Sequence, residues 1–229
     1  MASAPHFSPR LFRFLKDLAA NNDRAWFQEN KPRYENDVKE PLLAFIAAFA
    51  GPLGRISPHF LADPRPTGGS MFRIYRDTRF AKDKTPYKTS ASAQFRHAAG
   101  KNAHAPCYYL HLEPGSVFVG AGIWRPDTQG AAMIRDAILQ DPAGWKKIVN
   151  AKKFRESVEL QGDSLKRPPR GVDKEHPLLE DLKRKDFIAV QSFTEKDACS
   201  PDFLKRMAGV GKTTAPFVKF VTEAMGLEF

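Results

Sequence analysis

A dense set of cationic side chains within residues 71–89 is the strongest candidate for chemistry in this sequence. Six arginines and lysines stand there against two aspartates. Guanidinium groups make paired, charge-assisted hydrogen bonds to phosphate or carboxylate, and lysine adds further positive charge. The stretch therefore predicts a binding site for an anion. The cations are Arg73, Arg76, Arg79, Lys82, Lys84 and Lys88, and the acids are Asp77 and Asp83.

The local pattern predicts that a strand carries these cations into a loop. Phe72 and Ile74 alternate with Arg73 and Tyr75, as in a strand with one buried face. Residues 83–86 have the composition of a turn or loop. The cations would then lie where the strand ends, close to tyrosines and carboxylates.

A β-hairpin is the clearest element elsewhere in the chain. Residues 107–112 and 117–124 are apolar-rich and flank Glu113-Pro-Gly-Ser, a turn sequence. With Pro114 and Gly115 at the centre of the turn, alternation puts one continuous apolar face towards the core. The predicted pairs are Leu112 with Val117, Leu110 with Val119, and Tyr108 with Ala121.

The opposite face of this hairpin is predicted to form the second wall of a cleft beside the cations. Its two glycines leave room for a ring, a helix or a ligand, or alternatively for an aromatic side chain that covers a bare glycine. His111 is placed there like a catalytic group, although a packed, hydrogen-bonded histidine is the alternative. The face carries Tyr109, His111, Phe118, Gly120, Gly122 and Trp124.

Helices are predicted on both sides of the strands. Ser8-Pro9 is a typical helix start, and apolar residues follow at helical spacing. A second helix is predicted from Asp23, and a third is interrupted at Pro41 and ends at Gly51-Pro52. Residues 91–97 alternate as a further strand.

The chain after the hairpin is predicted to be mostly helical. Asp127 and Asp141 each cap the start of a helix. The later elements are a short strand within 154–162, a short helix at 178–182, a strand at 187–193, and helices at 201–207 and 216–225. We therefore predict one α+β domain over residues 1–229, with helices at 8–53, a central, mainly antiparallel sheet built around the hairpin at 70–125, and helices with a late strand at 127–229.

Composition and charge limit the class of protein. The 229 residues are 42% hydrophobic and 27% charged, as in ordinary globular proteins, which excludes wholesale disorder. The net charge of +10 favours acidic partners such as nucleic acid, nucleotides or phosphorylated metabolites. Many soluble proteins are equally basic without binding nucleic acid, so the charge does not decide between these classes.

The compartment is predicted to be the cytoplasm. Cys107 and Cys199 form no close pair, which favours a reduced interior, with one disulfide as the alternative. No basic segment followed by an apolar run is visible near the N-terminus, so no signal peptide is predicted. The most apolar window, residues 42–53, is too short to span a bilayer, so no membrane partner is expected.

Two motifs that suggest a cofactor or a metal do not hold. Gly209-Val-Gly-Lys-Thr lacks the first glycine of a phosphate loop, because Arg206 stands at that position, and it follows a predicted helix rather than a strand. His97, His104 and His111 recur every seven residues, which fits no compact metal spacing. We predict no metal site, and the sequence identifies no cofactor.

The central motif resembles that of a bacterial domain-of-unknown-function family, DUF2461. It comprises Arg73-x-x-Arg76-Asp77-x-Arg79-Phe80 and the trailing Asp83-Lys84-x-x-Tyr87-Lys88. The likeness extends to Asn21-Asn22-x-Arg24-x-Trp26-Phe27, Tyr109-x-His111, Gly120-x-Gly122-x-Trp124 and His176-Pro177, and thus over nearly the whole chain. The resemblance implies no reaction, substrate or cofactor.

Three hypotheses follow, with an anion pocket ranked first. In this pocket Arg73, Arg76, Arg79 and Lys84 would hold a phosphorylated or carboxylated small molecule, oriented by Asp77 or Asp83. Candidates for proton transfer are His111, Asp77 and Tyr87. Lys88, Tyr109 and Trp124 complete the predicted ligand-binding set. Whether the protein is an enzyme, and its oligomeric state, do not follow from the sequence.

The second hypothesis is nucleic-acid binding, and the third is a purely structural role for the motif. Nucleic acid would bind the dispersed cations at 152–153, 166–170 and 183–185. In the structural alternative, Arg76, Arg79, Asp77 and Asp83 form buried ion pairs that pin the loop to the sheet.

Overall fold

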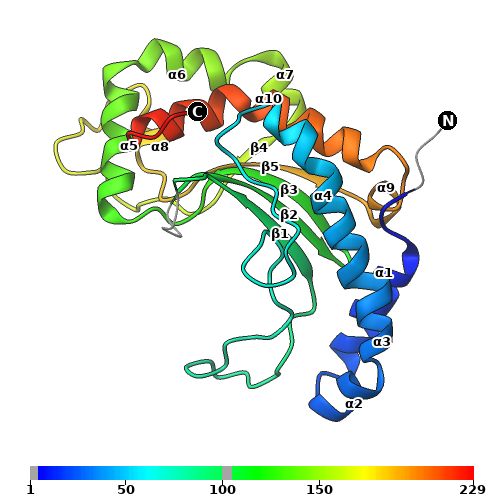
Figure 1. The fold of residues 1–229 in the computed structure, drawn as a ribbon. Helices are drawn as coiled ribbons and strands as arrows, with labels where there is room; N and C mark the ends of the chain where they lie inside the picture. The colour runs from blue at the N-terminus through cyan, green and yellow to red at the C-terminus, as the bar shows by residue number, and fades with distance from the viewer. Residues whose placement is uncertain (1–4, 100–104) are drawn as a thin grey trace.

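The fold is α+β, as the sequence predicts. A computed structural model describes residues 5–99 and 105–229, and it shows N-terminal helices, a five-stranded antiparallel sheet and C-terminal helices (Figure 1). The buried apolar side chains of all three parts form one continuous cluster.

The N-terminal helices begin where the sequence predicts them. Their bounds are α1 Pro9–Ala20, α2 Arg24–Glu29, α3 Lys31–Tyr34 and α4 Glu40–Gly54, with a π-helical segment η1 at Glu35–Lys39. The α1 helix buries Leu11, Phe14, Leu15 and Leu18, which lie at helical spacing. Asp23 caps α2, since its carboxylate accepts a hydrogen bond of 2.9 Å from the Trp26 N–H.

The predicted breaks at Pro41 and Gly51-Pro52 are wrong. Pro41 lies in the first turn of α4, directly after η1, and Pro52 lies within the last turn of the same helix. The first turn of a helix tolerates proline, because the N–H groups there have no intrahelical acceptor. The π-helical turn before Pro41 lets the chain pass this residue without ending the helix.

The sheet is antiparallel throughout and has the strand order β1-β2-β3-β5-β4. The strands are β1 Ala91–Arg96, β2 Cys107–Glu113, β3 Ser116–Ile123, β4 Glu159–Gln161 and β5 Phe187–Phe193. The predicted register of the β2–β3 hairpin is confirmed, with Leu110 opposite Val119 and Tyr109 opposite Gly120.

The C-terminal part contains six helices among the described residues. They are α5 Thr128–Gln140, α6 Pro142–Val149, α7 Lys152–Ser157, α8 Leu179–Leu182, α9 Glu195–Ala198 and α10 Phe203–Ala224. The two predicted terminal helices are one continuous helix, α10. Gly211 lies so close to the Ile56 side chain that a larger residue there would push this side chain aside. This packing contact explains why the helix contains a glycine at this position. The rejected phosphate-loop motif lies inside α10.

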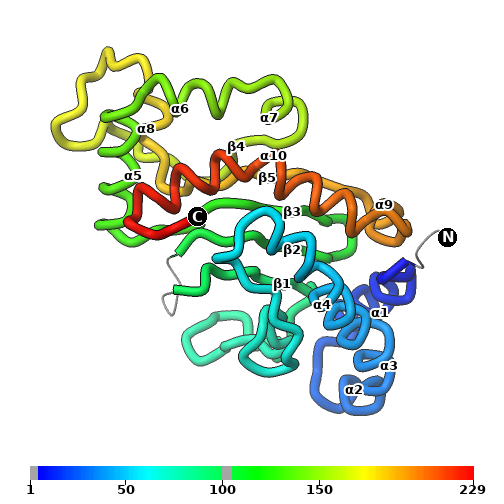
Figure 2. The backbone as a smooth tube through the Cα atoms, turned by 45° about the horizontal axis from the view of Figure 1, so that its top comes forward, coloured from blue at the N-terminus to red at the C-terminus, as the bar shows by residue number. Residues whose placement is uncertain are grey.

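Helices cover one face of the sheet. The α10 helix contacts β3 and β5, α4 contacts β1, and the two helices contact each other (Figures 1 and 2). Leu110, Val119 and their neighbours on this face are buried. The opposite face carries half-buried Tyr109, His111 and Phe118, so it is the side of the hairpin on which polar chemistry is accessible.

The strand predicted from residue 71 is wrong beyond its first residues. Phe72 N–H donates to Ser92 O at 3.0 Å and Gln94 N–H donates to Ser70 O at 2.8 Å, but the chain then leaves β1. Residues 73–88, here called the arm, form an irregular excursion from the sheet (Figure 1). The arm is closed by an isolated bridge between Tyr75 and Tyr87.

No helix within the described ranges, 5–99 and 105–229, is both long enough and apolar enough to cross a membrane.

The conformation of Gly122 yields a test of the sheet. Its φ is +118°, and a Cβ there would lie 2.1 Å from the Phe187 carbonyl oxygen. We expect Gly122→Ala to lower the free energy of unfolding by about 3 kcal/mol or more, since backbone strain and a backbone clash combine. Urea denaturation measures the loss.

Gly120→Ala is the matched control. A Cβ at Gly120 would meet its nearest atom, the Tyr109 Cβ, at an ordinary 3.9 Å. We expect a change below about 1 kcal/mol. Equal effects of the two substitutions would contradict the assigned strain.

Candidate functional site at the base of the arm

The base of the arm is fixed to the turn between α1 and α2. The side-chain oxygen of Asn22 accepts a hydrogen bond from the Tyr87 N–H, and its side-chain nitrogen donates to the Tyr87 carbonyl, both at 3.0 Å. The Tyr87 ring is buried and stacks on Phe27, with 4.1 Å between the ring centroids. Burial raises the pKa of the Tyr87 phenol. Tyr87, a predicted proton-transfer group, thus packs its ring against the helices.

The arginines and aspartates of the motif pair within the arm. Arg79 forms a two-pronged ion pair with Asp77, at 2.7 and 3.0 Å. Arg76 Nη1 donates to both Asp83 Oδ2 and Thr85 Oγ1. These pairs are partly or largely exposed to solvent. The structural alternative, in which buried pairs pin the loop to the sheet, is therefore wrong because the pairs are not buried. The carboxylate partner of Arg76 is Asp83.

A hollow of about 440 Å³ lies at the base of the arm, and we call it the arm-base hollow. It brings motif residues together with residues that come before and after the motif. Polar side chains dominate its lining and include two cations and one carboxylate. It is lined by Ala19, Asn22, Arg76, Asp83, Thr85, Tyr87, Lys88, Thr89 and Ser90.

Positive charge accumulates beside this hollow. Lys88 Nζ donates to the Arg73 carbonyl at 3.0 Å and lies 5.1 Å from the centroid of the Phe72 ring. Burial and, secondly, the positive charge of Arg73 lower the pKa of Lys88. Neither cation forms an ion pair with any residue in 5–99 or 105–229.

A line of hydrogen-bonded side chains runs from the hollow across the open face of the sheet. Thr89 Oγ1 donates to Glu113 Oε1 at 2.7 Å. The other carboxylate oxygen, Oε2, lies 3.1 Å from His111 Nε2, and His111 Nδ1 lies 3.1 Å from the Tyr109 hydroxyl. We call Tyr109, His111 and Glu113 the polar line. The predicted candidates His111 and Tyr109 are hydrogen-bonded directly to each other, and the Glu113 carboxylate links His111 to Thr89.

The arm and the polar line touch through Phe72. The Phe72 ring meets the Tyr109 ring edge-on, with 6.2 Å between the ring centroids. The same Phe72 ring also contacts the Lys88 ammonium group. The His111 ring stacks on Phe118 at 4.7 Å, and its side chain is 15% exposed. Lys88 is therefore separated from the Tyr109 end of the polar line by the Phe72 ring.

Sequence reasoning missed Glu113 and Thr89. Glu113 had a signal, because Tyr109, His111 and Glu113 alternate in β2 and must share one face. Its place beside Pro114 made it a turn residue in the prediction. Thr89 had no such signal, since a hydrogen bond to a residue 24 positions away depends on the tertiary fold.

The other predicted site residues lie apart from the hollow or pair locally. Lys84 Nζ donates to the Thr78 carbonyl at 2.9 Å, within the arm. Trp124 follows the end of β3, at the opposite end of the hairpin from Glu113, where its 60% exposed side chain stacks with Arg125. Asp77 pairs with Arg79, as described above.

The cations predicted to bind nucleic acid partly pair with acids on their own helices. Lys152 lies 3.9 Å from Glu156, and Lys183 lies 2.9 Å from Glu180. Such exposed pairs are common on solvated helix faces and contribute little to stability.

Cys107 and Cys199 are both free thiols. Burial raises the pKa of each thiol, which disfavours the nucleophilic thiolate. His104, one of the three evenly spaced histidines, lies outside the described residues. Within the described residues no three His, Cys, Asp or Glu side chains gather closely enough to hold a metal ion.

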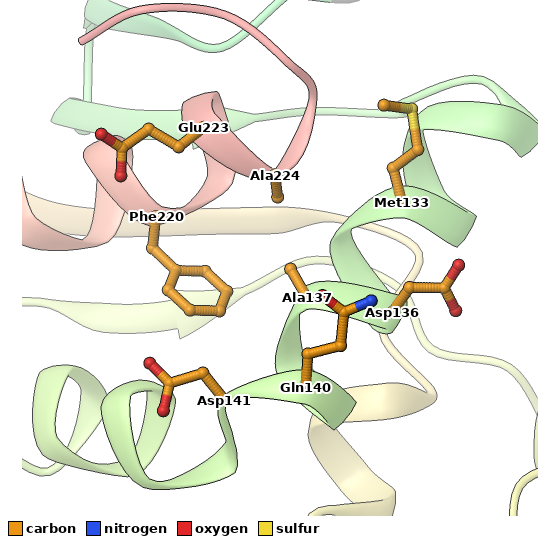
Figure 3. A pocket seen from close by; sticks show the side chains of 8 residues that line it. All are labelled: Met133, Asp136, Ala137, Gln140, Asp141, Phe220, Glu223 and Ala224. Carbon is orange, nitrogen blue, oxygen red and sulfur yellow. The ribbon is translucent and has the colours of Figure 1, made fainter.

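A second hollow, of about 510 Å³, lies between α5, α10 and the start of α6 (Figure 3). It is acidic, but two of its carboxylates have structural roles. Asp141 caps α6 by accepting from the Gly144 N–H at 2.8 Å, and Glu223 lies 3.7 Å from Lys219 in the same helix. We therefore place the candidate site at the arm base.

The Asn22 clamp can be tested by substitution. Asn22→Ala removes both hydrogen bonds to the Tyr87 backbone, and we expect a loss of about 1–3 kcal/mol in the free energy of unfolding. Trypsin should also cleave the arm faster, because its base is no longer held. Asn21→Ala is the control, since Asn21 makes an exposed bond to Asp17 O, and it should cost below about 0.5 kcal/mol. Equal effects would exclude a special role for Asn22.

The Arg76–Asp83 pair predicts a pH dependence. The Arg76 guanidinium, helped by the Thr85 N–H and hydroxyl, lowers the pKa of Asp83 from 3.8 to about 2. Because the folded-state pKa is depressed, the pair contributes its stability above pH 3.8 and loses it as the pH falls through about 2. Carboxyl-carbon NMR should give a midpoint near pH 2 for Asp83.

Two variants calibrate this titration. Arg76→Gln should return the midpoint towards 3.8, whereas Arg79→Gln, which removes a cation that pairs with Asp77 instead, should leave it unchanged. A wild-type midpoint near 3.8 would refute the pair.

Comparison with known proteins supplies a family. No curated protein matches the chain. A family model described as "conserved hypothetical protein (DUF2461)" matches residues 10–220, which include most of α1, the arm, the whole sheet and most of α10. That description names no activity, substrate or cofactor. The chain therefore belongs to the conserved hypothetical protein family DUF2461.

Proposed function

We propose that this protein binds a small molecule carrying a phosphate or carboxylate group in the arm-base hollow. The observation that carries the proposal is the convergence of Arg76 and Lys88 on one hollow of about 440 Å³ that four hydroxyl side chains also line. The cations match the acceptor oxygens of such an anion, and Ser90 adds a hydroxyl, whereas the Thr85 and Thr89 hydroxyls donate to Asp83 and Glu113.

Arg76 retains donors for a ligand. Its Nη1 is engaged by Asp83 and Thr85, while Nε and Nη2 have no partner among the described residues. Asp83 thus fixes the guanidinium without using its whole fork. A fixed, partly unsatisfied guanidinium is suited to a planar or tetrahedral anion, because little side-chain entropy is lost on binding.

Lys88 forms no ion pair with the described residues, whereas Arg73 lies close enough to Asp77 to help lower the pKa of that carboxyl. Burial and, secondly, the positive charge of Arg73 lower the pKa of Lys88. A bound anion would raise the pKa of Lys88 again. Arg79 and Lys84 already donate to acceptors within the arm. The proposed anion-binding residues are therefore Arg73, Arg76 and Lys88.

A second candidate function is binding of single-stranded nucleic acid at the tip of the arm. The observation that favours it is Phe80, which is 96% exposed and carries the Arg79 guanidinium 5.9 Å from its ring centroid. Exposed aromatic rings beside cations stack on bases. Fluorescence anisotropy with a labelled oligonucleotide should then show binding that weakens steeply with salt, and loss of affinity in Phe80→Ala. Unchanged affinity in that variant would reject this candidate.

Lys88→Gln tests the anion-binding function. Inorganic phosphate and a panel of phosphorylated and carboxylated metabolites should raise the melting temperature of the wild-type protein. In Lys88→Gln the affinity measured by calorimetry should fall about tenfold or more, since a charge-assisted hydrogen bond contributes roughly 1.5–3 kcal/mol.

Lys82→Gln is the matched control. It removes the same charge from the same arm, but Lys82 is exposed and does not line the hollow. Its affinity should stay within about twofold of the wild-type value, which corresponds to roughly 0.4 kcal/mol. Equal losses in both variants, or no binding by any compound of the panel, would reject the proposal.

A further inference from the structure

We infer that Tyr109 is an acid–base group for a substrate on the open face of the sheet, with His111 as its proton acceptor and Glu113 as a positioning residue. The polar line reaches the arm-base hollow only through Thr89, which lines that hollow and donates to Glu113. The chemistry of the inference rests on the polar line and does not depend on the proposed function.

The hydrogen bonds define where the protons lie. A carboxylate only accepts, so the 3.1 Å contact with Glu113 requires a proton on His111 Nε2. In the neutral imidazole, Nδ1 then presents its lone pair to the Tyr109 hydroxyl, which donates across 3.1 Å. The phenol therefore faces a base that is held in the tautomer able to take its proton.

The base is fixed from both sides. Glu113 is held by Thr89 Oγ1 at 2.7 Å, and Thr89 lines the arm-base hollow. The His111 ring stacks on Phe118, which restricts its rotation. A nucleophilic or basic group, a histidine and an orienting carboxylate in hydrogen-bond contact form the arrangement by which proteins activate a hydroxyl.

The surroundings keep the phenol protonated until it reacts. Burial raises the pKa of Tyr109, and a side-chain hydrogen bond with Ser92 opposes this rise. The negative charge of Glu113, and that of Cys107 when its thiol is ionised, raise the pKa of Tyr109 further. The cations nearest this face are Lys88, across Phe72, and Arg96, which lies close enough to Cys107 to lower its pKa. The phenol therefore needs His111 to give up its proton.

The step balances as a proton relay. The Tyr109 O–H bond breaks as its proton moves to His111 Nδ1, which leaves a phenolate beside an imidazolium paired with Glu113. The phenolate oxygen then takes a proton from an acidic C–H or O–H group of a substrate on the open face of the sheet. The net change is one proton moved from the substrate to His111, with no redox change, and the reverse path delivers a proton to the substrate.

A tyrosine-directed electrophile tests the relay without the natural substrate. With an aryl sulfonyl fluoride, the phenol oxygen bonds to sulfur, fluoride leaves, and the phenol proton goes to the base. We expect peptide mapping to show Tyr109 modified faster than Tyr75, although Tyr75 is 48% exposed, because no histidine of the described residues is hydrogen-bonded to the Tyr75 hydroxyl. His111→Gln should slow Tyr109 about tenfold or more and leave Tyr75 unchanged.

A second variant separates activation from packing. Glu113→Gln should slow Tyr109 as well, because the base loses its orienting carboxylate. The Tyr75 rate in each variant reports whether the fold is intact.

Two results would overturn the inference. If Tyr75 is modified before Tyr109, or if Tyr109 reacts equally fast in His111→Gln, the polar line is structural only. Phosphate binding without Tyr109 reactivity would reject the relay and keep the proposed function. A reactive Tyr109 in a protein that binds no anion would reject the proposed function and keep the relay.

Discussion

The strict alternation of the β2–β3 hairpin is the constraint on which the rest of the structure depends. Successive side chains of a strand point to opposite faces, so burial of Leu110 under the helices forces Tyr109 and His111 onto the other face. A slip of one residue would exchange the two faces and place a histidine and a carboxylate in the apolar core. The positions of the polar line are therefore fixed by the same packing that fixes the fold.

The arm depends on this frame at its base only. Beyond Phe72, which pairs with β1, the hydrogen bonds of the arm run within the arm or to Asn22. The ion pairs of the arm join residues that are two and seven positions apart in sequence. Exposed pairs of this kind shape a segment but stabilise it little. The buried Tyr87 ring and the Asn22 clamp are what hold the arm against α2, and they also set the edge of the arm-base hollow.

The predictable and unpredictable parts of this protein differ in the range of the interactions that determine them. The hairpin register followed from alternation and a Pro-Gly turn, and β5 was predicted from its continuous apolar run. The strand predicted from residue 71 failed because the chain leaves β1 after Phe72 and then pairs only with its own return, at the bridge between Tyr75 and Tyr87. Thr89 was missed because its partner is brought to it by tertiary structure, whereas alternation alone could have found Glu113.

The same difference in range divides the charged motif into two groups. Arg79 and Lys84 find acceptors within a few residues, so they neutralise or shape the arm itself. Arg73 and Lys88 lie fifteen residues apart in sequence and are brought together by the closure of the arm. Neither forms an ion pair with the described residues, although Arg73 lies close enough to Asp77 to help lower its pKa. The cations brought together by tertiary structure therefore lie at the base of the arm, whereas those that bind neighbouring residues lie further along it.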